Sequence, residues 1–559
     1  MIYPDTGLAL PERPATLARW GRARGAAVPI TISEIVAARS ATTLVVAGSV
    51  AEAEMLADQL TYFHHGGPPL LYFPDAEVLP YDSFSPHQDL ISQRLLTLRQ
   101  LGEGRALTLL TAVPGLLSRV PPLDYLQAHS LELETGQALE PVEFRRRLDE
   151  AGYQRVSQVA LHGEYAVRGS LLDFFPTGRD RPVRVDFLDD EIESLREFDP
   201  DSQVTSRRIQ ALATLPAREL PTDDDAVRAF RQRFRARFEG NPARSQIYRE
   251  VSEGRLPPGV EMYLPLFFEQ TATLWDYLPD DALIISTCDL TAQVDATWQQ
   301  VCSRHEQARH DSERPVLTPD ELFMRPDDRE QAIGRFPVLQ LERAELPDTG
   351  PLRANLPVAD APGLLINRRE EEPARRLAEY VSDTPGRVLF TTESPGRREV
   401  LLEMLRDSGI RPDNAETWAA GRDSELPVMI SVAPLDRGCV IGEQAFTLLT
   451  ETELVGEQPR RRRRRRRVQD PESLINDLTD LRPGAPVVHV DHGVGRYIGL
   501  THLDIDHALT EFVTLEYAGG DRLHVPVSAL HLISRYTGAA PEQAPLHRLG
   551  TDQCAKARR

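Results

Sequence analysis

Apolar runs and helix-like patterns alternate through the first 128 residues. Residues Thr43–Ala47 form a short apolar run with β-branched side chains, and the run ends at a glycine. Residues Val50–Leu60 then repeat apolar side chains at helical spacing, which predicts an amphipathic helix. The order recurs with predicted strands at Leu70–Phe73 and Leu107–Ala112 and a predicted helix at Asp89–Leu101 between them. Strands that alternate with helices predict a parallel α/β sheet.

The pattern changes between residues 129 and 215. Val183, Val185 and Phe187 alternate with more polar positions, which is typical of a half-buried strand. An Asp-Asp pair then predicts a tight turn, and Ile192–Phe198 predicts the returning strand of a hairpin. We therefore expect a small α+β insertion between two parts of the first α/β unit.

Two further stretches mix helices and strands. Between about 216 and 350, a charged helix at Asp225–Phe238 precedes an apolar strand at Ala282–Ser286. Between about 363 and 456 the two patterns alternate again, which predicts a second α/β domain. Its predicted elements are helix Glu370–Val381, strand Arg387–Thr391, helix Pro395–Ser408 and strand Pro427–Ser431.

A homopolymeric run marks the sharpest boundary in the chain. It consists of eight arginines, Arg460, Arg461, Arg462, Arg463, Arg464, Arg465, Arg466 and Arg467. Like charges at this density repel one another, so we expect an exposed, extended linker. Beyond it, short strands and glycine-rich turns predict a small all-β barrel. The strands are expected at Val487–Val490, Arg496–Leu500, Glu511–Tyr517 and Arg522–Val525.

These patterns divide the chain into consecutive segments. The α/β part consists of an N-terminal extension (1–24), two halves of a first α/β domain (25–128 and 216–350), the α+β insertion between them (129–215) and the second α/β domain (351–456). The arginine-rich linker (457–478), the barrel (479–550) and a tail (551–559) follow. The predicted fold class is thus a multi-domain α/β chain with an α+β insertion and a C-terminal β-barrel.

Composition narrows the functional classes. The 559 residues carry 64 basic and 85 acidic side chains, a net charge of −21. An acidic surface argues against wrapping of nucleic acid by the whole chain, although a local basic patch stays open. No uncharged stretch is long enough to span a bilayer and no secretory signal is visible, so we expect no membrane partner. The four cysteines are far apart, which fits a cytoplasmic location.

Signatures of catalysis are absent from the sequence. The only lysine is Lys556, so no Walker A loop can form, because its lysine must reach the β- and γ-phosphates of a nucleotide. We therefore expect no catalytic residue and no ATP hydrolysis by this chain. The histidines of the last domain lack zinc-ligand spacing and cysteine partners, so we expect no metal site.

Two features, the polar face of the hairpin and the arginine run, can each be interpreted either as a binding site or as solvated surface. Arg184 and Leu188 share the more polar face of the hairpin strand, and Arg168 lies on a predicted neighbouring strand. Exposed arginine beside exposed leucine is typical of a protein interface, but the pattern alone favours a solvated sheet face. The arginine run is favoured as a tether, with a weak, salt-sensitive contact to DNA or RNA as the alternative.

Several ordered segments resemble bacterial transcription-repair coupling factors, the Mfd family. Residues 486–500 (PVVHVDHGVGRYIGL), 517–527 (YAGGDRLHVPV) and 530–536 (LHLISRY) resemble the RNA-polymerase-interacting domain of that family. Residues 163–176 (GEYAVRGSLLDFFP) and 184–193 (RVDFLDDEIE) resemble the UvrA-binding domain that the family shares with the repair protein UvrB. Residues 72–82 and 259–268 resemble the flanking halves of a UvrB-like module, so the resemblance covers nearly the whole chain.

The resemblance implies a role in transcription-coupled nucleotide excision repair. Members of the family bind stalled RNA polymerase, displace it by ATP-driven translocation on DNA and recruit UvrA. The positions that match UvrA-contacting residues are Arg168 and Arg184, with Leu188 where the family often has an aromatic side chain. The polymerase β subunit is expected to dock on a strand of a Tudor or CarD-like barrel, near Leu500, His502, Leu503 and Asp504.

The resemblance also implies what this chain lacks. Residues 24–30 stand where UvrB has its phosphate loop, and they resemble the degenerate nucleotide fold of the coupling factors. ATP and Mg²⁺ belong to the translocase module of the family, which we expect outside residues 1–559, so the chain is an adaptor without a cofactor that contacts DNA weakly at most. The alternatives are a UvrB-like, ATP-dependent damage-binding enzyme and a transcription regulator that acts through the barrel alone.

Overall fold

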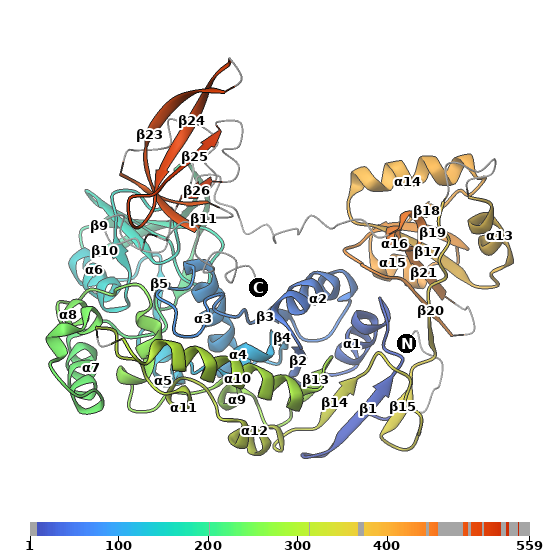
Figure 1. Ribbon diagram of the computed structural model, residues 1–559, viewed down its shortest axis with the longest axis horizontal. Helices are drawn as coiled ribbons and strands as arrows, with labels where there is room; N and C mark the ends of the chain where they lie inside the picture. Colours follow the sequence, from blue (N-terminus) through green and yellow to red (C-terminus); the bar gives the residue numbers. More distant parts are fainter. Residues whose placement is uncertain are drawn as a thin grey trace.

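A computed structural model of the chain describes residues 8–200, 202–311, 313–366, 374–442, 446–456, 484–489, 493–505, 508–526, 533–535 and 546. Figure 1 shows a central sheet (β1 to β4 with β13 to β15), a second α/β unit around β17 and a hairpin of long strands, β23 and β24. The arginine run lies outside the described residues. Among the described residues, no helix combines the length and the apolar character needed to cross a bilayer.

The central sheet is parallel throughout and has the strand order β15-β1-β14-β13-β2-β4-β3. It therefore confirms the predicted parallel α/β sheet, and it takes strands from both sides of the α+β insertion. Its strands are β1 (Leu17–Gly21), β2 (Thr43–Ala47), β3 (Leu70–Tyr72), β4 (Thr108–Ala112), β13 (Leu283–Ser286), β14 (Val338–Leu341) and β15 (Arg353–Asn355).

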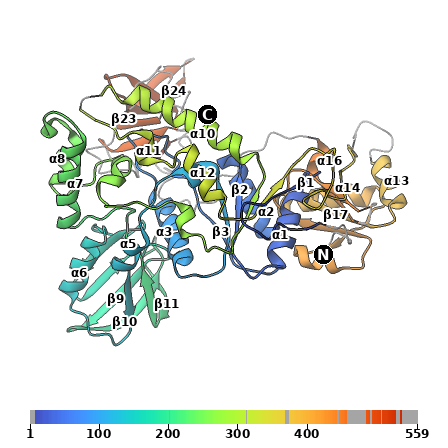
Figure 2. The same ribbon diagram turned by 90° about the horizontal axis from the view of Figure 1, so that it is seen from below.

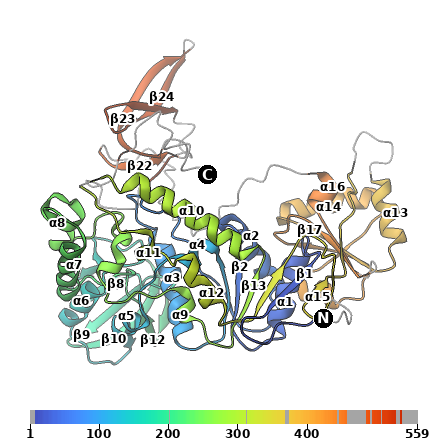
Figure 3. The ribbon, with the colours of Figure 1, turned by 60° about the horizontal axis from the view of Figure 1, so that its bottom comes forward.

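Helices cover both faces of this sheet. Leu44 and Val46 of β2 enter one hydrophobic core and Val45 and Ala47 enter the other, because side chains alternate along a strand. Figure 3 shows α10 lying across the front of the central sheet. The helices are α1 (Ala27–Ala37), α2 (Val50–Phe63), α3 (Gln88–Gly102), α4 (Val113–Leu117), α5 (Leu123–Ala128), α7 (Asp224–Arg237), α8 (Gln246–Ser252), α9 (Leu274–Tyr277), α10 (Leu290–Ala308), α11 (Pro319–Leu322) and α12 (Pro326–Ile333), with 3₁₀ turns η1 (Pro242–Arg244) and η2 (Val260–Leu266).

The α+β insertion forms a six-stranded sheet with the order β11-β10-β9-β8-β7-β6. Phe144 and Leu148 of α6 pack on its inner face, where the alternating Val183, Val185 and Phe187 are buried as predicted. Figure 2 shows α6 beside β9 and β10. The strands are β6 (Gln154–Arg155), β7 (Glu164–Arg168), β8 (Leu171–Phe174), β9 (Val183–Leu188), β10 (Glu191–Phe198) and β11 (Thr205–Ile209); α6 is Pro141–Glu150, and β5 (Leu131–Glu134) pairs with β12 (Ala211–Thr214).

The second α/β unit has the strand order β16-β20-β21-β17-β19-β18. Strands β21, β17, β19 and β18 are parallel to one another. Strand β20 runs antiparallel to both of its neighbours, β21 and β16. The elements are β16 (Val358–Asp360), β17 (Arg387–Thr392), β18 (Asp413–Asn414), β19 (Val428–Val432), β20 (Cys439–Ile441), β21 (Phe446–Thr450), α13 (Arg375–Asp383), α14 (Pro395–Asp407), α15 (Trp418–Asp423) and α16 (Glu451–Val455).

The two α/β units share one hydrophobic core. Trp418 of α15 is 1% exposed and meets Phe63 of α2 edge-on, with 4.8 Å between the ring centroids. Beside this contact, the hydroxyl of Tyr62 donates to Ser431 Oγ at 2.9 Å. A tryptophan buries a large apolar area, so this contact stabilises the packing of the two units against each other.

The last strands form an antiparallel sheet with the order β25-β24-β23-β22-β26. Its strands are β22 (Pro486–His489), β23 (Gly493–Ile505), β24 (Ala508–Glu516), β25 (Arg522–Pro526) and β26 (Ile533–Arg535). The glycine turn before β25 is confirmed, since Gly519 and Gly520 both have positive φ. Within the described residues the strands make an open sheet, so the closed barrel stays a prediction.

Candidate interaction sites

The outer face of the β9 sheet carries the polar half of the hairpin alternation. Arg184, Asp186 and Leu188 point away from the apolar core, as the alternation predicts. Leu188 is 63% exposed at the end of β9, next to a turn at which Asp189 has φ of 54°. An aliphatic side chain this exposed is available to a partner protein.

Arg184 is held inside this face rather than standing free. Its Nε and one Nη donate to the two carboxylate oxygens of Asp173, at 2.7 and 2.9 Å. Its guanidinium also lies 5.0 Å from the ring centroid of Phe198. The hydrogen bonds to Asp173 raise the pKa of Arg184, so the arginine stays charged. The sequence-based expectation of an exposed Arg184 is therefore wrong, because Asp173 lies directly opposite it in β8.

Arg168 is the exposed arginine of the predicted pair. It ends β7, and one Nη donates to the carbonyl oxygen of Ser157 at 3.2 Å. Register places Arg168 opposite Leu171 in β8, and Leu171 opposite Asp186 in β9. Arg168 thus lies on the same sheet face as Arg184 and presents an accessible guanidinium.

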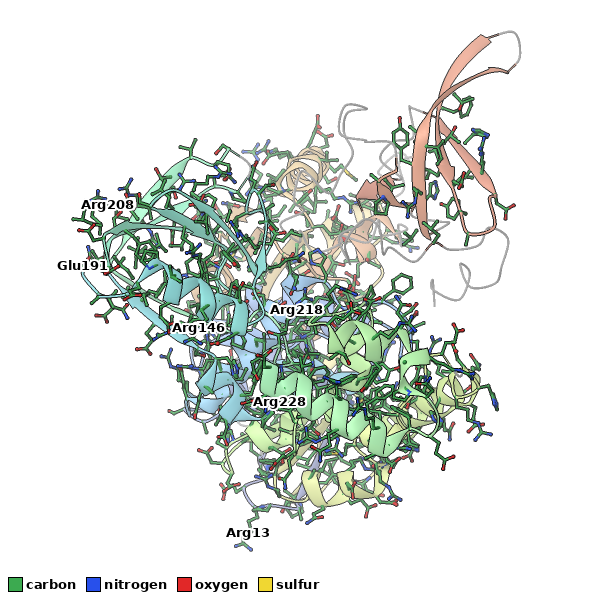
Figure 4. The ribbon with its side chains drawn as sticks, turned by 90° about the vertical axis from the view of Figure 1, so that its left-hand side faces the viewer. Arg13, Arg146, Glu191, Arg208, Arg218 and Arg228 are labelled. Carbon is green, nitrogen blue, oxygen red and sulfur yellow. The ribbon has the colours of Figure 1, made fainter. Side chains whose placement is uncertain are left out.

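A cross-strand row extends this face beyond the predicted residues. Arg184 pairs in register with Arg196 of β10, and Arg196 pairs with Arg208 of β11. Adjacent strands lie about 4.8 Å apart, so the row spans about 10 Å. Arg208 is exposed at its outer end, where Figure 4 labels it. The sequence pattern does not predict this row, because the alternation shows which positions share a face but not which strands become neighbours.

A second candidate site is the free edge of β23. Residues 493–496 of β23 pair with β22 on one side, and residues 496–505 pair with β24 on the other. Among the described residues, no strand pairs with the β22 side of the segment from Leu500 to Ile505. A strand edge of this kind offers main-chain donors and acceptors to an added strand.

The residues predicted to bind RNA polymerase lie on this edge segment. Leu500 is in register with Val513, and Leu503 is in register with Thr510. His502 and Asp504 lie on the same face of β23 as Leu500, and Leu503 lies on the opposite face. The structure describes the backbone of these four residues, so their individual side-chain roles remain predictions.

Beside the shared core, a cleft of about 800 Å³ lies between the two α/β units, at the carboxyl ends of their strands. Ligands of α/β proteins commonly bind at such an edge, often at helix N-termini. The loop before α1, residues 24–26, corresponds to the predicted degenerate phosphate loop. Its Ala26 N–H donates to the carbonyl oxygen of Arg437 at 2.9 Å, and a Cβ on Gly25 would lie 2.3 Å from the carbonyl oxygen of Gly438.

The other helix N-termini along this cleft are also capped by the chain itself. Glu52 of α2 accepts from the Gly48 N–H at 3.1 Å. Glu453 completes a capping box with Thr450 at the start of α16, and it also accepts from the Gly438 N–H at 3.2 Å. Glu451 accepts from the Glu393 N–H at 3.1 Å, beside the start of α14. Carboxylates thus occupy the backbone donors that a phosphate group would use.

Comparisons with known proteins agree with these positions. Residues 131–220 match the UvrB interaction domain, residues 380–454 match the D3 domain of MFD, and residues 481–537 match the CarD-like/TRCF RID domain. The transcription-repair-coupling factor of Escherichia coli (strain K12) is 40% identical over 540 residues, which is 96% of this chain and 47% of that relative.

Two further relatives show the same relationship. The transcription-repair-coupling factor of Haemophilus influenzae is 38% identical over 553 residues, covering 98% of this chain and 48% of the relative. The one of Myxococcus xanthus is 30% identical over 567 residues, covering 96% and 47%. The chain is homologous to the transcription-repair-coupling factors. It spans about half the length of the curated relatives it matches.

The homology assigns the two candidate sites to different domains. The face with Arg168, Arg184 and Leu188 lies within the match to the UvrB interaction domain, and the free edge of β23 lies within the match to the CarD-like/TRCF RID domain. Among the described residues, no group of three or more potential metal ligands is found.

Proposed function

We propose that this chain is an adaptor in transcription-coupled nucleotide excision repair, which binds RNA polymerase at one end and UvrA at the other. The observation that carries the proposal is the presence of two separate contact surfaces on one chain. One is the exposed arginine and leucine face in the UvrB interaction domain, and the other is the edge of β23 that no described strand pairs with, in the RID match. The homologues are named for coupling transcription to repair.

UvrA is the proposed partner of the face with Arg168, Arg184 and Leu188. Exposed guanidinium groups recognise carboxylates by paired hydrogen bonds, so an acidic surface is the expected complement. We add Arg208 to this interface, because it lies on the same face and is exposed. We propose that Arg184 does not contact UvrA directly. Its ion pair with Asp173 instead holds β8 and β9 in register, which keeps the contact face in place.

The β subunit of RNA polymerase is the proposed partner of the β23 edge. An added strand gains main-chain hydrogen bonds along residues 500–505, and alternate side chains supply specificity. Leu503 is the proposed apolar anchor, with Leu500, His502 and Asp504 beside it.

The cleft between the α/β units is proposed as a scaffold without a nucleotide. Glu52, Glu451 and Glu453 would repel phosphate groups at the helix N-termini that they cap, and the carbonyl of Arg437 blocks the start of α1. ATP and Mg²⁺ are assigned to the translocase part of the homologues, and direct DNA contact is assigned to a surface described below.

Capture of immobilised UvrA tests one end of the adaptor. Arg168→Glu reverses an exposed charge, and we expect at least a tenfold weaker affinity, about 1.4 kcal/mol. Arg105→Glu makes the same charge change at an exposed site of the central α/β unit, and capture should be unchanged. Equal affinities for the two variants would refute the assignment of this face to UvrA.

Capture of RNA polymerase tests the other end. Leu503→Arg should weaken binding of the β subunit, whereas Val455→Arg, at a side chain that is 45% exposed on the second α/β unit, should not. Turnover of ATP by the purified chain would instead support a UvrB-like enzyme. Full repair function after deletion of residues 1–456 would support a regulator that acts through the RID sheet alone.

A further inference from the structure

One part of this acidic chain is strongly basic. Residues 226–255 contain eight arginines and three glutamates, a net charge of +5 within 30 residues, whereas the whole chain carries −21. The arginines are Arg228, Arg231, Arg233, Arg235, Arg237, Arg244, Arg249 and Arg255. This segment contains most of α7 and all of α8, which lie at an outer end of the molecule (Figures 1 and 3).

Packing of α7 places its arginines at the surface. Phe230 and Phe234 occupy the buried stripe of the helix, one turn apart. Phe230 packs on Phe267 with 4.8 Å between ring centroids, and Phe234 packs on Tyr248 of α8 at 5.1 Å. Beside this stripe, Arg235 and Arg237 are exposed, and Arg231 and Arg233 are half-buried. Figure 4 shows α7 turned toward the viewer, with Arg228 labelled.

Most of these arginines have no carboxylate partner. Arg233 donates to the carbonyl oxygen of Leu266 at 3.1 Å, and Arg235 donates to the Tyr248 hydroxyl at 2.6 Å. Arg249 donates to the carbonyl oxygens of residues 243 and 244, at 2.7 and 3.1 Å. Within the described part of the chain, ion pairs in this segment are confined to Arg228, Arg237 and Arg255. The charge of the other five arginines is therefore not offset by a paired carboxylate.

Two other helices carry arginines that are paired with carboxylates. Arg146 of α6 forms ion pairs with both Glu143 and Glu150 on its own helix. Arg375 of α13 pairs with Glu379 four residues later. Opposite charges at helical spacing pair readily in these two cases, whereas α7, η1 and α8 bring together five arginines without such a partner among the described residues.

The pKa of Tyr248 responds to these positive charges. Burial alone would raise the pKa of its phenol, yet hydrogen bonds from Arg231 and Arg235 lower it. Arg235 donates to this hydroxyl at 2.6 Å, so at least one guanidinium group places positive potential on this side of α7.

We propose that the arginine surface of α7 and α8 (Arg231, Arg233, Arg235, Arg244 and Arg249) binds the phosphate backbone of duplex DNA. Backbone phosphates need an array of cations and no apolar contact. A protein partner would need an apolar anchor, and among the described residues no large apolar side chain is exposed between 226 and 255. A single strand would need exposed aromatic rings for stacking, but Phe230, Phe234 and Tyr248 are buried.

The size of the helix pair suits this ligand. The 14 residues of α7 extend for about 21 Å, which matches about six base pairs at about 3.4 Å each. The contact would let a chain that is acidic overall lie along DNA next to a transcription complex. It is independent of the contacts proposed for UvrA and RNA polymerase.

Fluorescence anisotropy with a labelled duplex of mixed sequence tests the proposal in the full chain. Serine replaces Arg460–Arg467 in every protein compared, so that the arginine run cannot mask the signal. The patch variant is Arg235→Glu, Arg244→Glu and Arg249→Glu. The matched control, Arg105→Glu, Arg376→Glu and Arg411→Glu, makes the same change in net charge at exposed arginines of other elements.

We expect the patch variant to bind duplex at least tenfold more weakly than the control. Loss of three phosphate contacts should also lower the slope of log K against log salt by about 3. Arg235 touches Tyr248, so Arg244→Glu with Arg249→Glu serves as a second variant that leaves α7 unaltered, with a slope change of about 2. Equal binding by patch and control variants, or no salt-dependent binding by the serine-substituted chain, would overturn the proposal.

Discussion

The ion pair between Arg184 and Asp173 decides how the face proposed to bind UvrA should be probed. Asp173 has a side chain that is 2% exposed, and Arg184 has one that is 17% exposed. Nε and one Nη of Arg184 donate to the two oxygens of this carboxylate, at 2.7 and 2.9 Å. The substitution Arg184→Ala would therefore leave a buried carboxylate without its partner, and its main effect should be on stability rather than on contact with a partner.

The size of this effect follows from the burial of the pair. Breaking a buried ion pair by removing one partner costs about 3–5 kcal/mol, and the partial exposure of Arg184 favours the lower end, about 3 kcal/mol. The double substitution Asp173→Ala with Arg184→Ala removes both charges, so it should cost less than the sum of the single changes. We expect a coupling of about 2 kcal/mol.

Hydrogen exchange measured by mass spectrometry can localise the change in this multi-domain chain. A loss of about 3 kcal/mol should speed exchange of the most protected amides of β8 to β10 about 100-fold in Arg184→Ala. The double variant should recover part of this protection. If the two single effects simply add in the double variant, the pair is not coupled and the reasoning is wrong.

Two further predictions concern the scaffold. Trp418→Ala should cost about 3–5 kcal/mol and speed exchange in α2 and α15, because it opens the shared core beside Phe63; the same substitution at the half-buried Trp298 should cost clearly less. Burial alone would raise the pKa of Glu321, but hydrogen bonds from Arg237 and the Thr318 cap lower it. The charged Glu321 therefore adds about 0.5–1 kcal/mol to the free energy of unfolding. This contribution is complete above the ordinary glutamate pKa and is lost as pH falls through the lowered pKa. The difference in unfolding temperature between wild type and Glu321→Gln should be present near neutral pH and vanish in acid, and a difference that grows in acid would contradict this sign.

Local elements could be predicted from the sequence because their causes are local. The strand at Thr43–Ala47 has its predicted bounds, and the helix from Val50 extends to Phe63 rather than Leu60. The β9–β10 hairpin turns at its Asp-Asp pair, as expected, because alternation and turn chemistry are set by neighbouring residues. The elements of the second α/β unit likewise agree within a few residues where the structure describes them.

The interaction face shows the limit of such prediction. Arg168 and Leu188 are exposed, as the alternation suggested, but Arg184 is paired with Asp173 from a strand 11 residues earlier. The absence of lysine before Lys556 removes the Walker A motif from the sequence. It could not show that Arg437, more than 400 residues away, supplies the carbonyl that caps α1.

The sequence by itself determined the secondary structure, the absence of a Walker lysine and the similarity to the coupling factors. These properties depend on residue type and spacing along the chain. Only the tertiary structure decided that Arg184 is internal, that Arg208 continues its row, that residues 500–505 keep an unpaired edge in the described sheet and that α7 and α8 share an unneutralised cationic surface. Each of these depends on which distant side chains become neighbours, and the pattern along one chain does not contain that information.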